Sequence, residues 1–97
     1  MKLGMFTEPK AYIEALEQRI EGRRNFGLPQ AKEMYEFAQT EDGFKYFLSM
    51  NPTISEEDRE EAYERWIAWN GDHITHIEKE IRKWEREIRK TREQYGL

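Results

Sequence analysis

Two histidines and a glutamate in the last third of the chain are the side chains best suited to bind a metal ion. His73, His76 and Glu80 are separated by three and four residues, so a helix would present all three on one side. Imidazole and carboxylate are competent metal ligands. The histidine pair supplies only two ligands, however, and Glu80 lies two turns from His73, too far to share one ion comfortably. We therefore interpret them as surface histidines and predict no metal site and no cofactor.

The candidate nucleophiles lack the residues that would activate them. Ser49 and Ser55 have no histidine nearby in sequence and no nucleophile elbow around them. The chain has no cysteine, which removes thiolate catalysis and disulfides, and no glycine-rich phosphate loop. Carboxylates are too numerous to single out a catalytic pair. We therefore predict a protein that is not an enzyme.

Charge is segregated along the C-terminal half. Residues 53–64 hold six acids and one base, and residues 82–92 hold six bases and two acids. The bases could contact a phosphate backbone, although glutamates interrupt them. The acids could imitate DNA phosphates, although acids at a helix start are also explained by the helix dipole. The candidates for nucleic-acid contact are Arg82, Arg86, Arg89 and Lys90.

A cluster of aromatic residues precedes the histidines. Trp66 and Trp69 are three residues apart and therefore neighbours on a helix, so both can hardly face one narrow core. Core packing is the preferred interpretation of Trp66. An exposed tryptophan beside an arginine is typical of an interface anchor. The candidates for partner binding are Tyr63, Arg65, Trp66 and Trp69.

The last quarter of the chain supplies the element that must position these side chains. Apolar positions alternate at three- and four-residue spacing from residue 74 to residue 95, while almost every residue between them is charged. This pattern is typical of a coiled-coil seam, which either the rest of the chain or a second copy must bury. The second possibility predicts a homodimer. The residues of this self-association seam are Ile74, Ile77, Ile81, Trp84 and Ile88.

Shorter helices are predicted before the seam. Thr7 is expected to cap a helix that runs to residues 22–24, and a turn is expected at residues 25–29, where Gly27 and Pro29 punctuate the chain. A second helix follows to residue 38. Thr40 and Ser55 are expected to cap two further helices, separated by a break at Asn51-Pro52.

Asn70-Gly71-Asp72 leaves two alternatives open. Asn-Gly is a strong turn signal, and Gly71 could close a tight helical hairpin. The heptad phase continues across Gly71, however, so one helix from Ser55 to Tyr95 would keep a single seam with Asn70 as a polar seam position.

Composition supports an all-α fold. The 97 residues include 13% aromatic and 37% charged residues, with a net charge of -4. We predict one domain, 1–97, with a small cluster of four to five helices. Residues 1–52 would form a short-helix cluster, and residues 53–97 a long, heptad-patterned C-terminal helix or a helical hairpin. The apolar run at residues 1–6 is too short for a signal peptide and no segment is apolar enough to span a membrane, so a cytoplasmic location is expected.

These features favour a protein that docks on another protein or protein machine as an inhibitor, regulator or adaptor. The seam, the surplus of aromatics and the segregated charge support this class. A short, cysteine-free, highly charged helical chain also resembles phage and mobile-element accessory proteins in general style, although no motif carries that resemblance. The alternatives are a nucleic-acid-binding protein that uses the basic C-terminal helix and a DNA-mimicking inhibitor that uses the acidic face at residues 56–64.

Overall fold

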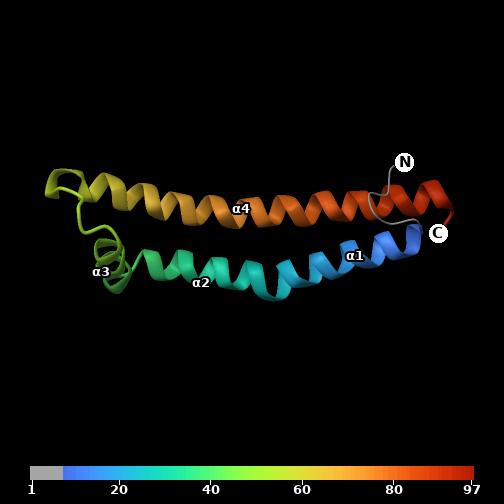
Figure 1. The fold of residues 1–97 in the computed structure, drawn as a ribbon, viewed down its shortest axis with the longest axis horizontal. Helices are drawn as coiled ribbons and strands as arrows, with labels where there is room; N and C mark the ends of the chain where they lie inside the picture. The colour runs from blue at the N-terminus through green and yellow to red at the C-terminus, as the bar shows by residue number, and fades with distance from the viewer. Residues whose placement is uncertain (1–7) are drawn as a thin grey trace.

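The computed structural model describes residues 8–97 and shows an elongated helical hairpin of 60 × 22 × 17 Å. A long C-terminal helix runs along one side, and the N-terminal helices lie end to end along the other, as Figure 1 shows. Thr7, the expected first cap, lies outside the described residues, and Glu8 occupies the position before the first helix. The elements are α1 (Pro9–Gly22), η1 (Arg23–Gly27), α2 (Leu28–Ala38), α3 (Glu41–Met50) and α4 (Glu56–Tyr95).

The turn expected at residues 25–29 is wrong, because η1 carries the helix from α1 into α2 without a break. A proline inside an α-helix clashes with the carbonyl four residues earlier, which is that of Asn25 for Pro29. The chain avoids this clash with a wider, π-helical turn, in which the Leu28 N–H donates to the Arg23 carbonyl five residues back. Gly27 and Pro29 therefore coincide with one widened turn in a continuous helical rod, and the helix does not end there.

Residues 8–97 form three helices when α1, η1 and α2 are joined, so the expected cluster of four to five helices is wrong. The described residues are helical almost throughout and contain no strand. Only α3 departs from the hairpin axis, at the end where the chain turns back into α4 (Figure 1). The reason is burial: a long rod covers the whole seam of α4, which a compact cluster at one end would leave exposed.

Gly71 does not end α4, so the continuous helix is correct and the hairpin at Asn70-Gly71 is not formed. Asn70 is a buried seam residue, and its side-chain amide donates to the Trp66 carbonyl at 2.9 Å. A Cβ atom at Gly71 would meet the Tyr35 ring at 3.2 Å. Glycine at this position therefore allows α2 to approach α4 closely.

The hydrophobic core is the seam of α4 packed against α1 and α2. Ile77, Ile81 and Ile88 are buried, and Ile74 and Trp84 are partly buried against the same cluster. The seam that could have paired two copies is therefore covered within one chain, and a homodimer through it would require the hairpin to open. The residues of α1 and α2 that cover it are Ile13, Leu16, Ile20 and Ala31.

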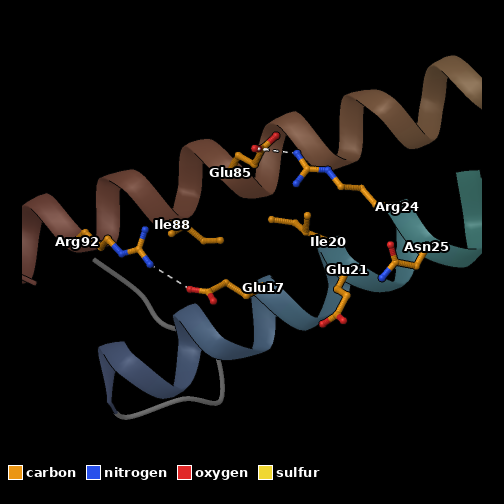
Figure 2. A pocket seen from close by; sticks show the side chains of 8 residues that line it. All are labelled: Glu17, Ile20, Glu21, Arg24, Asn25, Glu85, Ile88 and Arg92. Atoms are coloured by element: carbon orange, nitrogen blue, oxygen red, sulfur yellow. Dashed lines mark hydrogen bonds and ion pairs between the residues drawn. The ribbon is translucent and has the colours of Figure 1, made fainter.

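Ion pairs and hydrogen bonds across the hairpin flank this core. Arg24 pairs with Glu85 at 3.0 Å, and Arg92 pairs with Glu17 at 3.1 Å. Figure 2 shows these two pairs on either side of Ile20 and Ile88, which face each other across the two helices. Both ion pairs are about half exposed, so they fix the register of the hairpin more than they stabilise it. None of the helices in the described part of the chain is long and apolar enough to cross a membrane.

Candidate functional site

The corner between α2 and α3 places α3 against the first turns of α4. The Thr40 hydroxyl accepts a hydrogen bond from the Gly43 N–H at 3.0 Å, which confirms Thr40 as a helix cap. Gly43 is buried against the end of α2: a Cβ atom there would lie 2.9 Å from the Ala38 Cα and would overlap the Phe37 carbonyl. The corner can therefore be this tight only with glycine.

An aromatic cluster joins α3 to α4 behind this corner. Phe47 is buried, and its ring lies 5.3 Å from Trp66 and 5.8 Å from Tyr63, measured between ring centroids. Phe44 meets Tyr63 edge-on at 4.8 Å, a geometry that the ring quadrupoles favour. The Tyr63 hydroxyl donates to the Ala38 carbonyl, so Tyr63 fastens α4 to the end of α2.

Large apolar side chains extend from this cluster to the surface. Trp69 is 62% exposed and lies one helical turn beyond Trp66, which contacts Tyr46 at 6.2 Å between centroids. Tyr46 in turn meets Phe37 edge-on at 5.9 Å. We call these four residues the aromatic patch: Phe37, Tyr46, Trp66 and Trp69.

The structure separates the sequence-predicted docking residues into two groups. Tyr63 and Trp66 face α3 and are partly buried, whereas Arg65 and Trp69 are exposed. The spacing of the two tryptophans predicted that they would not face the same core, and in the structure only Trp66 packs against α3. Sequence reasoning missed Phe37 and Tyr46, which reach the surface beside them. For Tyr46, the signal is α3 itself, because a helix apolar around most of its circumference cannot bury every side chain against one neighbour.

The histidines and the glutamate do not converge. His73 stacks on Trp69, with ring centroids 5.9 Å apart and planes 5° from parallel. His76 instead lies 3.5 Å from Glu80, which also pairs with Arg23 of η1 at 3.6 Å. Within residues 8–97, no group of three or more histidine, cysteine, aspartate or glutamate side chains is placed to hold a metal ion.

The candidate nucleophiles make local hydrogen bonds. The Ser49 hydroxyl donates to the Tyr46 carbonyl at 2.7 Å, and the Ser55 hydroxyl donates to the Asp58 carboxylate at 2.9 Å. Ser55 does precede the first residue of α4, but its side chain makes no capping bond to the backbone. The cap expected from the Ser55 side chain is therefore not formed, and both hydroxyls donate to groups three residues away in sequence.

The candidate nucleic-acid residues lie on the face of α4 turned away from α1 and α2. Arg82, Arg86, Arg89 and Lys90 are all exposed, and among the residues that the structure describes none of them forms an ion pair. Glu80 and Glu85 lie closer to the seam, where they pair with arginines across the hairpin, whereas Glu93 is exposed four residues beyond Arg89. The outer face of α4 is therefore predominantly basic between Lys79 and Lys90.

A shallow groove of about 470 Å³ lies between α1 and α4 at the two ion pairs shown in Figure 2. Its apolar lining is provided by Ile20 and Ile88, and the charged groups at its rim include the paired side chains described above. Because these charges already neutralise one another, the groove offers no concentrated charge for a ligand.

No model of a known protein family matches the sequence, and no match was found among curated proteins or solved structures. The function must therefore be argued from the surfaces themselves. Two surfaces stand out: the aromatic patch and the charged outer face of α4.

Tyr12 supplies a pH-dependent contact between α1 and the C-terminal part of α4. Its hydroxyl donates to the Glu87 carboxylate at 3.2 Å. Burial and then the Glu87 charge raise the pKa of the Tyr12 phenol above its ordinary value of 10.0. Below that value both the folded and the unfolded chain keep the proton. Above it the unfolded chain releases the proton first, so the free energy of unfolding falls as pH rises.

We therefore expect Tyr12→Phe to remove part of the loss of stability at alkaline pH. Urea denaturation between about pH 9 and pH 11 should give a steeper fall for the wild type than for Tyr12→Phe. Glu87→Gln should give an intermediate slope, because it removes the charge but not the burial. Equal slopes for wild type and Tyr12→Phe would contradict this assignment.

Proposed function

We propose that this protein is a non-enzymatic helical hairpin that docks on another protein through the aromatic patch. The observation that carries the proposal is Trp69, which is 62% exposed on α4, three residues after Trp66 on the helix surface. Tryptophan and tyrosine dominate the binding energy of protein interfaces, especially when rigid elements present them. Large exposed apolar groups that lie next to one another are typical of interaction sites.

The surroundings of Trp69 support a docking role. His73 stacks on one face of the indole and fixes its orientation, which lowers the entropy that binding must remove. Arg65, exposed on the same helix, adds a polar group of the kind found at interface rims. Phe26 is also exposed, at 68%, but forms no ring contact with another aromatic residue of the described chain.

Such a protein would act as an inhibitor, a regulator or an adaptor of a larger protein machine. The small size, the high content of charged residues and the absence of cysteine agree with the general style of phage and mobile-element accessory proteins. The basic outer face of α4 supports a second candidate function, the binding of nucleic acid, because its cations have no ion-pair partners among residues 8–97.

The docking function predicts that Trp69→Ala abolishes capture of a specific protein. The tagged wild type should retain one dominant protein at near-equal stoichiometry from nuclease-treated lysate of the source cell. Trp69→Ala should lose it, because truncating an interface anchor costs about 2 kcal/mol, or about 30-fold in affinity. The fold should be unaffected, since substitutions of exposed residues change stability by about 0.5 kcal/mol or less.

Phe26→Ala is the matched control, because it removes an equally exposed but isolated ring and should leave capture unchanged. If Trp69→Ala still retained the partner protein, the docking proposal would be wrong. Recovery of nucleic acid without nuclease, with no retained protein, would transfer the proposal to the basic face of α4.

A further inference from the structure

One continuous stripe of exposed side chains runs along the outer face of α4, opposite the seam. Its members follow at three- or four-residue intervals, as one face of a straight helix requires. All of them are exposed. We call this the outer stripe: Glu57, Glu61, Glu64, Ala68, Asp72, Thr75, Lys79, Arg82, Arg86 and Arg89.

The charges of the outer stripe are ordered by sign. Its N-terminal end is acidic and its C-terminal end is basic, and the residues between are Ala68, Asp72, Thr75 and Lys79. The stripe spans residues 57–89, which is about 48 Å of helix at about 1.5 Å per residue. Because α4 is one unbroken helix, the two ends cannot fold back on each other, and the charges of opposite sign cannot meet within one chain.

The charges of the outer stripe are complementary to those of a second stripe that runs in the opposite direction. When a second stripe is laid antiparallel on the first, Glu57 faces Arg89, Glu61 faces Arg86 and Glu64 faces Arg82. Each facing pair has its midpoint close to residue 73, so one two-fold axis brings all of them together. Such an arrangement is an isologous interface, in which every contact occurs twice.

We propose that the outer stripe is a surface for a second copy of this chain, paired antiparallel through α4. Two of its acids, Glu57 and Glu64, and its bases Arg82 and Arg89 have no ion-pair partner among the described residues. A second copy accounts for both the acidic and the basic ends. A nucleic acid lying along the same face would be repelled by the acidic end.

The residue types of the outer stripe also determine how tightly the two copies bind each other. Ala68 is its only apolar member, so charge pairing and not apolar burial holds the copies together. Exposed charge pairs are weak and are screened by salt. The dimer is therefore expected at low ionic strength and high protein concentration. It is independent of the aromatic patch, and Trp69→Ala should leave it intact.

Analytical ultracentrifugation of the full chain tests the proposal. The wild type should self-associate in about 0.01 M salt and dissociate in about 1 M salt, as the Debye length falls from about 30 Å to about 3 Å. Glu64→Arg and Arg82→Glu should each raise the dissociation constant about tenfold or more, because each places like charges opposite one another at two symmetry-related contacts.

A mixture of the two single variants supplies the decisive comparison. Glu64→Arg and Arg82→Glu should associate with each other, since the heterodimer restores opposite charges at both contacts. The double variant should return to within about threefold of the wild type, as a compensating pair does in a double-mutant cycle. Arg19→Glu and Glu33→Arg make the same charge changes on exposed residues of α1 and α2 and should leave the dissociation constant unchanged.

Three results would overturn the proposal. These are a wild type that is monomeric at every concentration in low salt, a dimer that does not respond to salt, and variants that fail to restore association when mixed. A monomer that binds duplex DNA, weakened by Arg82→Glu and strengthened by Glu64→Arg, would instead assign the basic half of the stripe to nucleic acid.

Discussion

Ile81→Asp is expected to unfold the isolated chain. Ile81 is 4% exposed and lies in the seam of α4, in contact with the core formed by α1 and α2. A carboxylate there has no water and no partner, and an isolated buried charge is among the costliest substitutions known. We expect a loss of about 4 kcal/mol or more, against a total stability of about 5–15 kcal/mol for a domain. Far-UV circular dichroism and urea denaturation measure it.

Ala68→Asp is the control for this experiment. It adds the same charge to the same helix at an exposed position and should cost less than about 1 kcal/mol, mainly in helix propensity. A folded monomer in Ile81→Asp would mean that the seam packs between chains in solution, contrary to the hairpin described above. The experiment therefore separates an internal seam from an intermolecular one.

Gly43→Ala is expected to disrupt the corner that carries the aromatic patch. The added Cβ would overlap the Phe37 carbonyl and lie 2.9 Å from the Ala38 Cα. Both obstacles are backbone atoms, which cannot move aside as a flexible side chain could, so α3 must shift away from α2. We expect a loss of about 3 kcal/mol, at the upper end of overpacking effects, measured by thermal or urea denaturation.

Gly22→Ala provides a matched comparison. Gly22 lies in α1 with helical backbone angles, and a Cβ atom there would meet nothing within 4 Å. Alanine should raise the free energy of unfolding by about 0.5–1 kcal/mol through the lower entropy of the unfolded chain and better helix propensity. If Gly43→Ala and Gly22→Ala had similar effects, the tight α2–α3 corner would be incorrect.

The same substitution bears on the docking proposal. Phe37 and Tyr46 lie on either side of the corner and touch one another only because α3 turns sharply against α2. A displaced α3 would separate the two rings, while Trp69 on α4 would stay in place. Gly43→Ala should thus weaken partner binding less than Trp69→Ala does.

Local and periodic signals were sufficient for several parts of the fold. The alternation of apolar positions at residues 74–88 predicted a helix with one buried stripe, and the seam is indeed packed in the core. The Thr40 cap and the break after residue 50 also follow from nearby residues alone. The phase of the heptads across Gly71 favoured a continuous helix, although the turn signal of Asn70-Gly71 left the alternatives equal.

The docking residues could be located only in part from their spacing. Trp66 and Trp69 had to face different directions, but the spacing could not show which one α3 would cover. That depends on the α2–α3 corner, which brings Phe47 onto Trp66 and leaves Trp69 in solvent. Their role in partner binding stays a prediction.

By itself, the sequence determined that the chain is helical, where the seam lies and how the charges are distributed along α4. These properties depend on the spacing of residues along one helix, where residues that are neighbours in space are also near in sequence. The tertiary structure alone decided that the seam is covered by the same chain and that Pro29 widens a turn instead of ending a helix. Both depend on burying Ile20 and Ala31 against one partner helix, and such long-range burial outweighs the local turn signals between them.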